Sequence, residues 1–227
     1  PILSKSTLID TETAIRGLYK EFEENDLIDV NQLQYFIELP ETEWEILQIQ
    51  KNFEKNKTKL FLREDANEEK IKNANLTNAK FIVFATHALV SGEIDNLIEP
   101  GIVLTPNYKD NTNNEGLLLA SEISNLDLLN TDLVVLSACN TSSSSSLDSI
   151  PLTGLAKSFF LAGAKSLIVT GWSVESESAA FLSSNIFKKA INEEKNFSIA
   201  LQDTINEMID KNMHPLLWAP FILIGDI

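Results

Sequence analysis

The sequence predicts an α/β fold in which a mostly parallel central sheet carries helices on both faces. Two short apolar segments, 81–85 and 133–136, end next to residues that can carry chemistry, and a third apolar segment spans 166–170. Each segment is continuously apolar rather than alternating, which is typical of parallel strands that are buried on both faces. A helical pattern connects the second and third segments, so we expect a strand–helix–strand unit. We expect the three strands to be neighbours in one sheet.

The residues before the first of these strands predict mainly helices. Weak patterns favour helices over 11–25 and around 30–38, and Leu39-Pro40 interrupts the chain. An acidic first turn and apolar residues at helical spacing predict a helix over 41–55. The segment 59–62 is expected to be a short strand, and Asp65 is expected to cap a helix over 66–75.

The remaining elements follow from turn residues and periodicity. We expect an exposed polar hairpin tip over 107–116, and a loop that carries 102–106 leads into it. The elements expected after this tip are a returning strand at 117–119, a helical turn at 120–123, a helix over 154–162 that Thr153 caps and Gly163 ends, helices over 177–192 and 197–211, and a last strand over 219–225.

Composition narrows the class of protein. With 227 residues, of which 44% are hydrophobic, the chain can bury one sizeable core, so we expect a single domain over 1–227. The net charge of −15 opposes binding to nucleic acid and to anionic membranes, so neither is expected as a partner. No apolar run approaches the length of about 18 residues that a membrane span needs, and we expect a cytoplasmic location. The chain begins at Pro1, and we expect it to be a fragment of a longer protein.

The single cysteine is the most suggestive residue. Cys139 follows the second apolar strand and His87 follows the first, 139 − 87 = 52 residues upstream. Ligands bind at the carboxyl ends of strands in open α/β sheets, so a reactive Cys–His pair is predicted there. Each residue also has a structural interpretation, as a buried thiol or a core histidine. One cysteine allows no internal disulfide and no metal site of paired cysteines, and we expect neither a metal nor a cofactor.

Five ordered blocks of sequence resemble the CHAT family of caspase-like proteins. They are Ala85-Thr86-His87, the segment 133–141 around Cys139, the segment 154–164, Trp172-Ser173-Val174, and His214-Pro215 with Trp218-Ala219-Pro220-Phe221. The similarity covers 39–227 and leaves 1–38 weakly assigned. It implies a caspase-like fold and relationship to a clan of cysteine peptidases that includes caspases, separase and the gingipains.

The resemblance implies a bacterial cysteine endopeptidase that cleaves protein substrates. His87 would accept the thiol proton of Cys139, and the backbone N–H groups of Ala88 and Cys139 would hold the oxyanion. The residues expected to bind substrate are Trp172, Ser173, Glu175 and Glu177. Members of the family often follow tetratricopeptide repeats, so a repeat array or another sensor region in the full-length protein is expected to regulate the domain.

Two departures from the family pattern keep a second interpretation open. Many relatives carry glycine where this chain has Ala88, and many carry an acidic residue where it has Ser176. Alanine keeps the backbone N–H, but it would be strained if this position required a positive φ. A catalytically silent protein-interaction module is therefore the alternative. Trp172 is interpreted equally as a core residue and as part of a substrate pocket.

Overall fold

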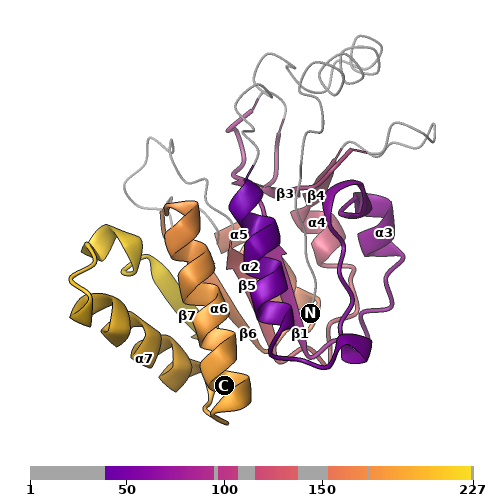
Figure 1. Ribbon diagram of the computed structural model, residues 1–227. Coiled ribbons are helices and arrows are strands. Elements are labelled where there is room, and N and C mark those ends of the chain that lie inside the picture. Colours follow the sequence, from indigo (N-terminus) through magenta and orange to yellow (C-terminus); the bar gives the residue numbers. More distant parts are fainter. Residues whose placement is uncertain (1–38, 95–96, 107–115, 138–152, 173, 226–227) are drawn as a thin grey trace.

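The computed structural model describes residues 39–94, 97–106, 116–137, 153–172 and 174–225 (Figure 1). Its centre is a four-stranded sheet with the strand order β1-β5-β6-β7. The four strands are β1 (Phe81–Ala85), β5 (Leu133–Ser137), β6 (Ser166–Thr170) and β7 (Phe221–Gly225). β1, β5 and β6 are parallel, and β7 is antiparallel at the edge. The prediction of three neighbouring parallel strands in an α/β fold is therefore confirmed.

The register between β1 and β5 is continuous over five residue pairs. It runs from Phe81 opposite Leu133 to Ala85 opposite Ser137, with a constant offset of 137 − 85 = 52 residues. One more backbone hydrogen bond extends the pairing beyond β1, because the N–H of Thr86 donates to the carbonyl oxygen of Ser137 over 3.2 Å. The carboxyl ends of the two strands are therefore level.

Helices cover both faces of this sheet, as the continuously apolar strands predict. One face is covered by α2 (Pro40–Gln50), α6 (Ser176–Asn192) and α7 (Phe197–Asp210), and the other by α3 (Glu68–Lys72), α4 (Ala120–Ile123) and α5 (Thr153–Leu161). Figure 1 shows α2 and α6 side by side in front of the sheet and α5 behind it. Successive strand residues serve opposite faces: Val83 and Val135 pack with the first group, and Phe84 and Leu136 with the second.

A second, smaller sheet begins where β1 ends. It consists of the antiparallel strands β2 (Ala88–Leu89), β3 (Gly101–Val103) and β4 (Leu117–Leu119). Thr86 and His87 connect it to the main sheet through Val103. The Thr86 hydroxyl donates to the carbonyl oxygen of Val103 over 2.8 Å, and the N–H of Val103 donates to the carbonyl oxygen of His87 over 2.9 Å. The backbone that leaves β1 is fixed within two residues.

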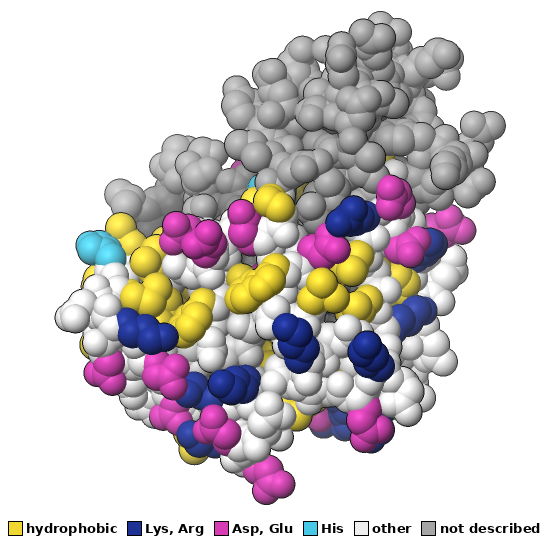
Figure 2. Space-filling view, in the orientation of Figure 1, with side chains coloured by type: hydrophobic (Ala, Val, Ile, Leu, Met, Phe, Trp, Pro, Cys, Tyr) yellow, Lys and Arg dark blue, Asp and Glu magenta, His cyan; other side chains and the backbone are white. Residues whose placement is uncertain are grey.

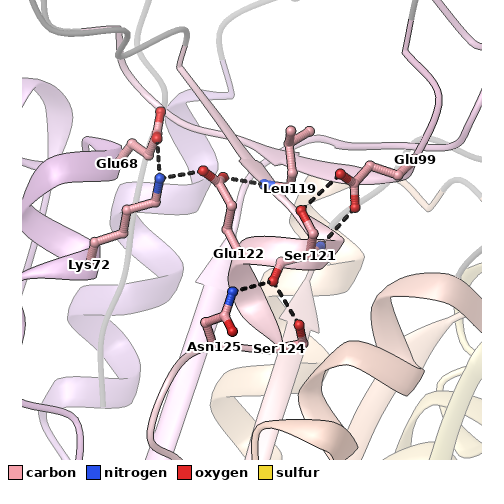
Figure 3. A network of polar contacts seen from close by, with 8 residues as sticks. All are labelled: Glu68, Lys72, Glu99, Leu119, Ser121, Glu122, Ser124 and Asn125. Carbon is pink, nitrogen blue, oxygen red and sulfur yellow. Dashed lines mark hydrogen bonds and ion pairs between the residues drawn. The ribbon is translucent and has the colours of Figure 1, made fainter.

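A network of polar contacts holds the end of β4 and the start of α4 against α3 (Figure 3). Lys72 of α3 contacts the Glu122 carboxylate, which also accepts from the N–H of Leu119 over 2.9 Å. Glu99 accepts from the N–H and the hydroxyl of Ser121 over 2.7 and 2.8 Å. Partial burial acts to lower the pKa of Lys72, but the hydrogen bond to Glu122 and a second carboxylate outweigh it and raise the pKa above its ordinary value. The ammonium group therefore stays charged and keeps these elements together.

Two predictions upstream of the sheet are wrong. Residues 59–62 form no strand, although their side chains alternate: Phe61 packs with the α5 side of the core, and Leu60 and Leu62 pack against the α2 side. The period-two pattern is therefore real, but in the described part of the chain this backbone joins no sheet. The helix expected over 66–75 is only α3, and Asn67 rather than Asp65 caps it, because the Asn67 side chain accepts from the N–H of Lys70.

Other boundaries agree closely with the predictions. α6 and α7 begin and end within one residue of the predicted helices, and the return strand and last strand are β4 and β7. α2 begins at Pro40, which suits the first helical position, and ends five residues earlier than predicted. Three short 3₁₀ helices complete the described elements: Lys55–Lys57, Arg63–Asp65 and Pro215–Leu217. The helices predicted over 11–25 and around 30–38, and the hairpin tip over 107–115, lie outside the described residues.

Gly163 turns the chain from α5 into β6. Its φ of +106° belongs to the region that favours glycine, and an added Cβ would lie 2.9 Å from the backbone nitrogen of Leu129. Gly171, at the other end of β6, has an ordinary φ, and a Cβ there would come no closer than 3.6 Å to a neighbouring atom. The two glycines therefore form a matched pair for substitution by alanine, which is strained at Gly163 and fits at Gly171.

We predict that Gly163→Ala lowers the free energy of unfolding by about 1 to 3 kcal/mol, because alanine at this position combines backbone strain with a steric clash. Gly171→Ala should change it by no more than about 0.5 kcal/mol. Urea unfolding followed by circular dichroism measures both values. Equal effects of the two substitutions would contradict the role of Gly163 in closing this turn.

Candidate functional site

His87 lies at the carboxyl end of β1, two residues after the strand. Its side chain is buried, with 8% of its surface exposed, and its backbone is held by the hydrogen bond from Val103. Cys139 follows Ser137, the last residue of β5, by two positions in the sequence and lies outside the described residues. Ser173 also lies outside them. The structure thus describes the histidine of the predicted pair and the strand that leads to the cysteine.

Ala88, which follows His87, is the first residue of β2. In an antiparallel pair, residues that exchange hydrogen bonds alternate with residues that do not. His87 and Val103 form a hydrogen-bonded pair, because the carbonyl oxygen of His87 accepts from the N–H of Val103. The next pair, Ala88 opposite Ile102, is therefore a pair without hydrogen bonds between its members, and the N–H of Ala88 points away from β3. Among the described residues, only Arg63, Glu194 and Asn212 have a positive φ besides glycines. Alanine is therefore unstrained here, and the departure from glycine costs nothing in backbone conformation.

The predicted substrate-binding residues follow β6, the strand beside β5. The indole of Trp172 is 39% exposed and its Nε1–H donates to the carbonyl oxygen of Leu216 over 3.2 Å, so it is no core residue. Glu175 and Glu177 are exposed around the start of α6. The Glu175 carboxylate accepts from the hydroxyl of Ser178 over 3.1 Å, which orients it.

Glu175 and Glu177 line a pocket of about 620 Å³ between the starts of α2 and α6 and the end of α7. Its other lining residues are Glu41, Trp44, Ser178, Phe181, Lys211, Met213 and Leu217. On the face shown in Figure 2, apolar side chains form patches with acidic side chains along their upper border. Lys211 is the only cation among the described residues that line the pocket, and its Nζ lies 4.4 Å from the centre of the Phe181 ring. The part of the lining that the structure describes therefore combines apolar surface with three carboxylates.

The sequence reasoning missed Glu45, a carboxyl group buried beneath the sheet end. Only 2% of Glu45 is exposed, although it belongs to α2. Its Oε2 accepts from the hydroxyl of Ser137 over 3.0 Å, and its Oε1 lies 2.6 Å from the hydroxyl oxygen of Ser183 on α6. One side chain thus connects α2, the end of β5 and α6. Helical spacing could have found it, because positions 42, 45, 46 and 49 form one buried stripe of α2.

The hydrogen bonds around Glu45 suit a protonated carboxyl group. Burial raises the pKa of Glu45 to about 7, and the hydrogen bonds from Ser183 and Ser137 lower it only in part. The Ser183 hydroxyl also lies 2.9 Å from the carbonyl oxygen of Ala179. A hydroxyl has one hydrogen to donate, so Ser183 can donate to Ala179 while it accepts the proton of a neutral Glu45. Ionisation would remove that proton, and Ser183 would then have to choose between donating to Ala179 and donating to Glu45.

We predict that Glu45 makes the stability of the fold fall as pH rises. Its pKa is higher in the folded chain, about 7, than its ordinary value of 4.5, so its stabilising effect is complete below pH 4.5 and is lost as pH rises through 7. The loss amounts to about 3 kcal/mol. Urea unfolding of wild type and Glu45→Gln between pH 4.5 and 8.5 measures it. If the free energy of unfolding changed with pH equally in wild type and in Glu45→Gln, Glu45 would not titrate in this range.

The described residues contain neither a metal-binding cluster of acidic, histidine and cysteine side chains nor a helix that could span a membrane. No group of three or more histidine, cysteine, aspartate or glutamate side chains there could hold a metal ion. None of the helices in that part of the chain has both the length and the apolar character of a membrane span.

Comparison with known proteins identifies the family to which the chain belongs. A search of the curated proteins found no match. The family model described as "CHAT domain" matches residues 21–226, which is most of the chain and includes every strand and helix of the described fold. The buried strands, the helices on both faces and the histidine at the end of β1 agree with this match. The chain therefore belongs to the CHAT family, the caspase-like family related to cysteine peptidases.

Proposed function

We propose that this chain is a cysteine endopeptidase that uses Cys139 as nucleophile and His87 as base. The observation that carries the proposal is the β1–β5 register. Its offset of 52 residues equals the separation of His87 and Cys139 in the sequence, and each residue follows its strand by two positions. Paired parallel strands lie about 4.8 Å apart, so two side chains that leave them at equal distances are well placed to meet. The membership of the CHAT family supports the same pair.

The proposed reaction needs only the side chains of this pair, two backbone N–H groups and water. His87 removes the proton of the Cys139 thiol, and the thiolate attacks the carbonyl carbon of the scissile peptide bond. The N–H groups of Ala88 and Cys139 stabilise the oxyanion. The protonated His87 then gives its proton to the leaving amine, and a thioester remains. Water, activated by His87, hydrolyses the thioester, which releases the carboxyl product and restores the thiol.

The substrate proposed for this site is a protein segment with a basic side chain next to an apolar one. The exposed Trp172 and the pocket with Glu175 and Glu177 follow β6, whose carboxyl end lies beside that of β5. Apolar side chains such as Trp44 and Phe181 would bury an apolar residue of the substrate, and the carboxylates would attract the basic one. We include Ser173 in this substrate region because it lies between Trp172 and the pocket residues in the sequence.

Control by a sensor region of the full-length protein is part of the proposal. The resemblance to domains that follow tetratricopeptide repeats supports it. Equal rates of peptide cleavage by this chain and by the full-length protein, with and without an activating partner, would rule such control out.

The alternative, a catalytically silent interaction module, draws on Ala88 and Ser176. Ala88 lies in an unstrained strand with its N–H directed away from β3, so only the absent acid at Ser176 still favours the alternative. Two exposed carboxylates, Glu175 and Glu177, flank Ser176 and offer a similar charge. These observations make the peptidase the better supported candidate.

We predict that Cys139→Ala abolishes cleavage of arginyl and lysyl peptides and of unfolded proteins. His87→Ala should lower kcat/KM by about 10²- to 10⁴-fold, the usual contribution of a general acid–base group. His214→Ala is the matched control: His214 is the other histidine, and it accepts from the N–H of Leu216 in an exposed turn. Its rate should stay within about twofold of wild type. Full activity in the Cys139→Ala variant would overturn the mechanism.

We predict that Glu175→Gln combined with Glu177→Gln raises KM for peptides that carry arginine or lysine by about fivefold or more, which corresponds to about 1 kcal/mol of lost attraction. The KM of peptides that carry a neutral residue in place of the arginine or lysine should not change. Glu64→Gln, which removes the charge of an exposed glutamate outside the pocket, is the control. A similar rise in KM for neutral peptides, or in the control, would show that these carboxylates do not read the substrate charge.

A further inference from the structure

Glu45, a buried acid of α2, links that helix to the end of β5, the strand from which the chain continues to Cys139. Glu45 is 2% exposed, and it hydrogen-bonds Ser137 at the last position of β5 and Ser183 within α6. A carboxyl group in such a place is costly unless it is neutral or paired, so a simpler core would have an apolar residue here. The proposed reaction does not use this acid directly.

The contact with Ser137 fixes the side chain at the end of the β5 ladder. Ser137 is buried, with 5% exposed, and its carbonyl oxygen accepts from the N–H of Thr86. Glu45 therefore fixes the side chain of Ser137, and the backbone of Ser137 in turn fixes Thr86, the residue before His87. Both partners of the proposed pair begin from this point, because Cys139 follows Ser137 by two positions and His87 follows Thr86 directly.

We propose that Glu45 is a positioning residue of the peptidase: as a neutral acid it fixes the end of β5 through Ser137, so that the Cys139 thiol is presented to His87 in a reactive geometry. This inference rests on the proposed function of the Cys139–His87 pair. The geometry explains why a polar side chain of α2 reaches beneath the sheet end. Catalytic rates are sensitive to such positioning, since a misplacement of about 1 Å can cost about 100-fold.

The other charged groups near Glu45 lie in ion pairs or line the pocket and a surface recess, so the protonation of Glu45 itself is the variable that this inference concerns. β1 and β5 contain no charged residue. On α6, Lys189 is paired with Glu207, and Lys188 and Glu177 line surface recesses. On α2, Glu43 is paired with Arg63 and Glu41 lines the pocket.

His87 is the titratable group on the neighbouring strand end. Burial raises the pKa of Glu45, the hydrogen bonds from the two serine hydroxyls lower it only in part, and no charge is among the causes. Above neutral pH, the ionised Glu45 would place an unpaired charge beneath the end of β5, and the cost of burying that charge would loosen the packing around Ser137.

The test is the rate at which iodoacetamide alkylates Cys139, the chain's single cysteine, measured at pH 6 and pH 8. Ser137→Ala and Ser183→Ala form a matched pair, since each removes one hydroxyl from Glu45, but only Ser137 leads to Cys139. We expect Ser137→Ala to lower the alkylation rate and kcat by about tenfold, and Ser183→Ala to change them by less than about threefold at a similar loss of stability. Glu45→Gln, whose amide can imitate the neutral acid, should keep the wild-type rate at pH 6 and exceed it at pH 8.

The outcomes separate this inference from the proposed function. An alkylation rate that His87→Ala leaves unchanged would refute the Cys–His pair, whatever the serine variants do. A rate that depends on His87 but falls equally in Ser137→Ala and Ser183→Ala, in proportion to their loss of stability, would reduce Glu45 to a structural residue. The inference also fails if Glu45→Gln and wild type have the same ratio of rates at pH 6 and pH 8.

Discussion

The parallel pairing of β1 with β5 is the constraint on which the rest of the structure depends. Both strands are apolar on both faces, so a shift of one residue would exchange the side chains that pack with α2 and α6 for those that pack with α5. Burial therefore fixes the offset of 52 residues. The same offset separates His87 from Cys139 in the sequence, so the packing of the core and the chemistry proposed for the site depend on one register.

Around this ladder, the fold fixes the segment after β1 far more firmly than a loop usually is. Thr86 bonds to β5 and to β3, and the antiparallel pairing of β2 directs the N–H of Ala88 away from β3. Beneath the end of β5, Glu45 adds a third connection from α2. Burial raises the pKa of this acid to about 7, so its contribution to stability declines as pH rises through neutrality.

Much of the fold could be predicted from the sequence, because continuous apolar runs and helical periodicity reflect burial directly. The strands β1, β5 and β6 and the helices α6 and α7 have clear patterns of this kind, and the structure contains each of them. The segment 59–62 was misassigned because alternation shows where side chains go but not whether the backbone has a partner strand. Glu45 escaped notice because an acid in a helix is ordinarily on its surface, and its burial depends on serines 92 and 138 residues away. The positions of His87, Trp172 and Glu175 at strand ends were visible in the sequence, whereas the pocket that joins Glu175 to α2 and α7 arises only from tertiary packing.

The most direct test of the account is an experimental structure of the chain with Cys139 alkylated by a peptidyl electrophile that ends in arginine. The account predicts a nitrogen of the His87 ring within about 4 Å of the Cys139 sulfur, the reach that a nucleophile and its base require. It also predicts the arginine side chain among the carboxylates of the pocket. A His87 ring that faces away from the sulfur, more than about 8 Å from it, would contradict the central claim that the β1–β5 register brings these two residues together.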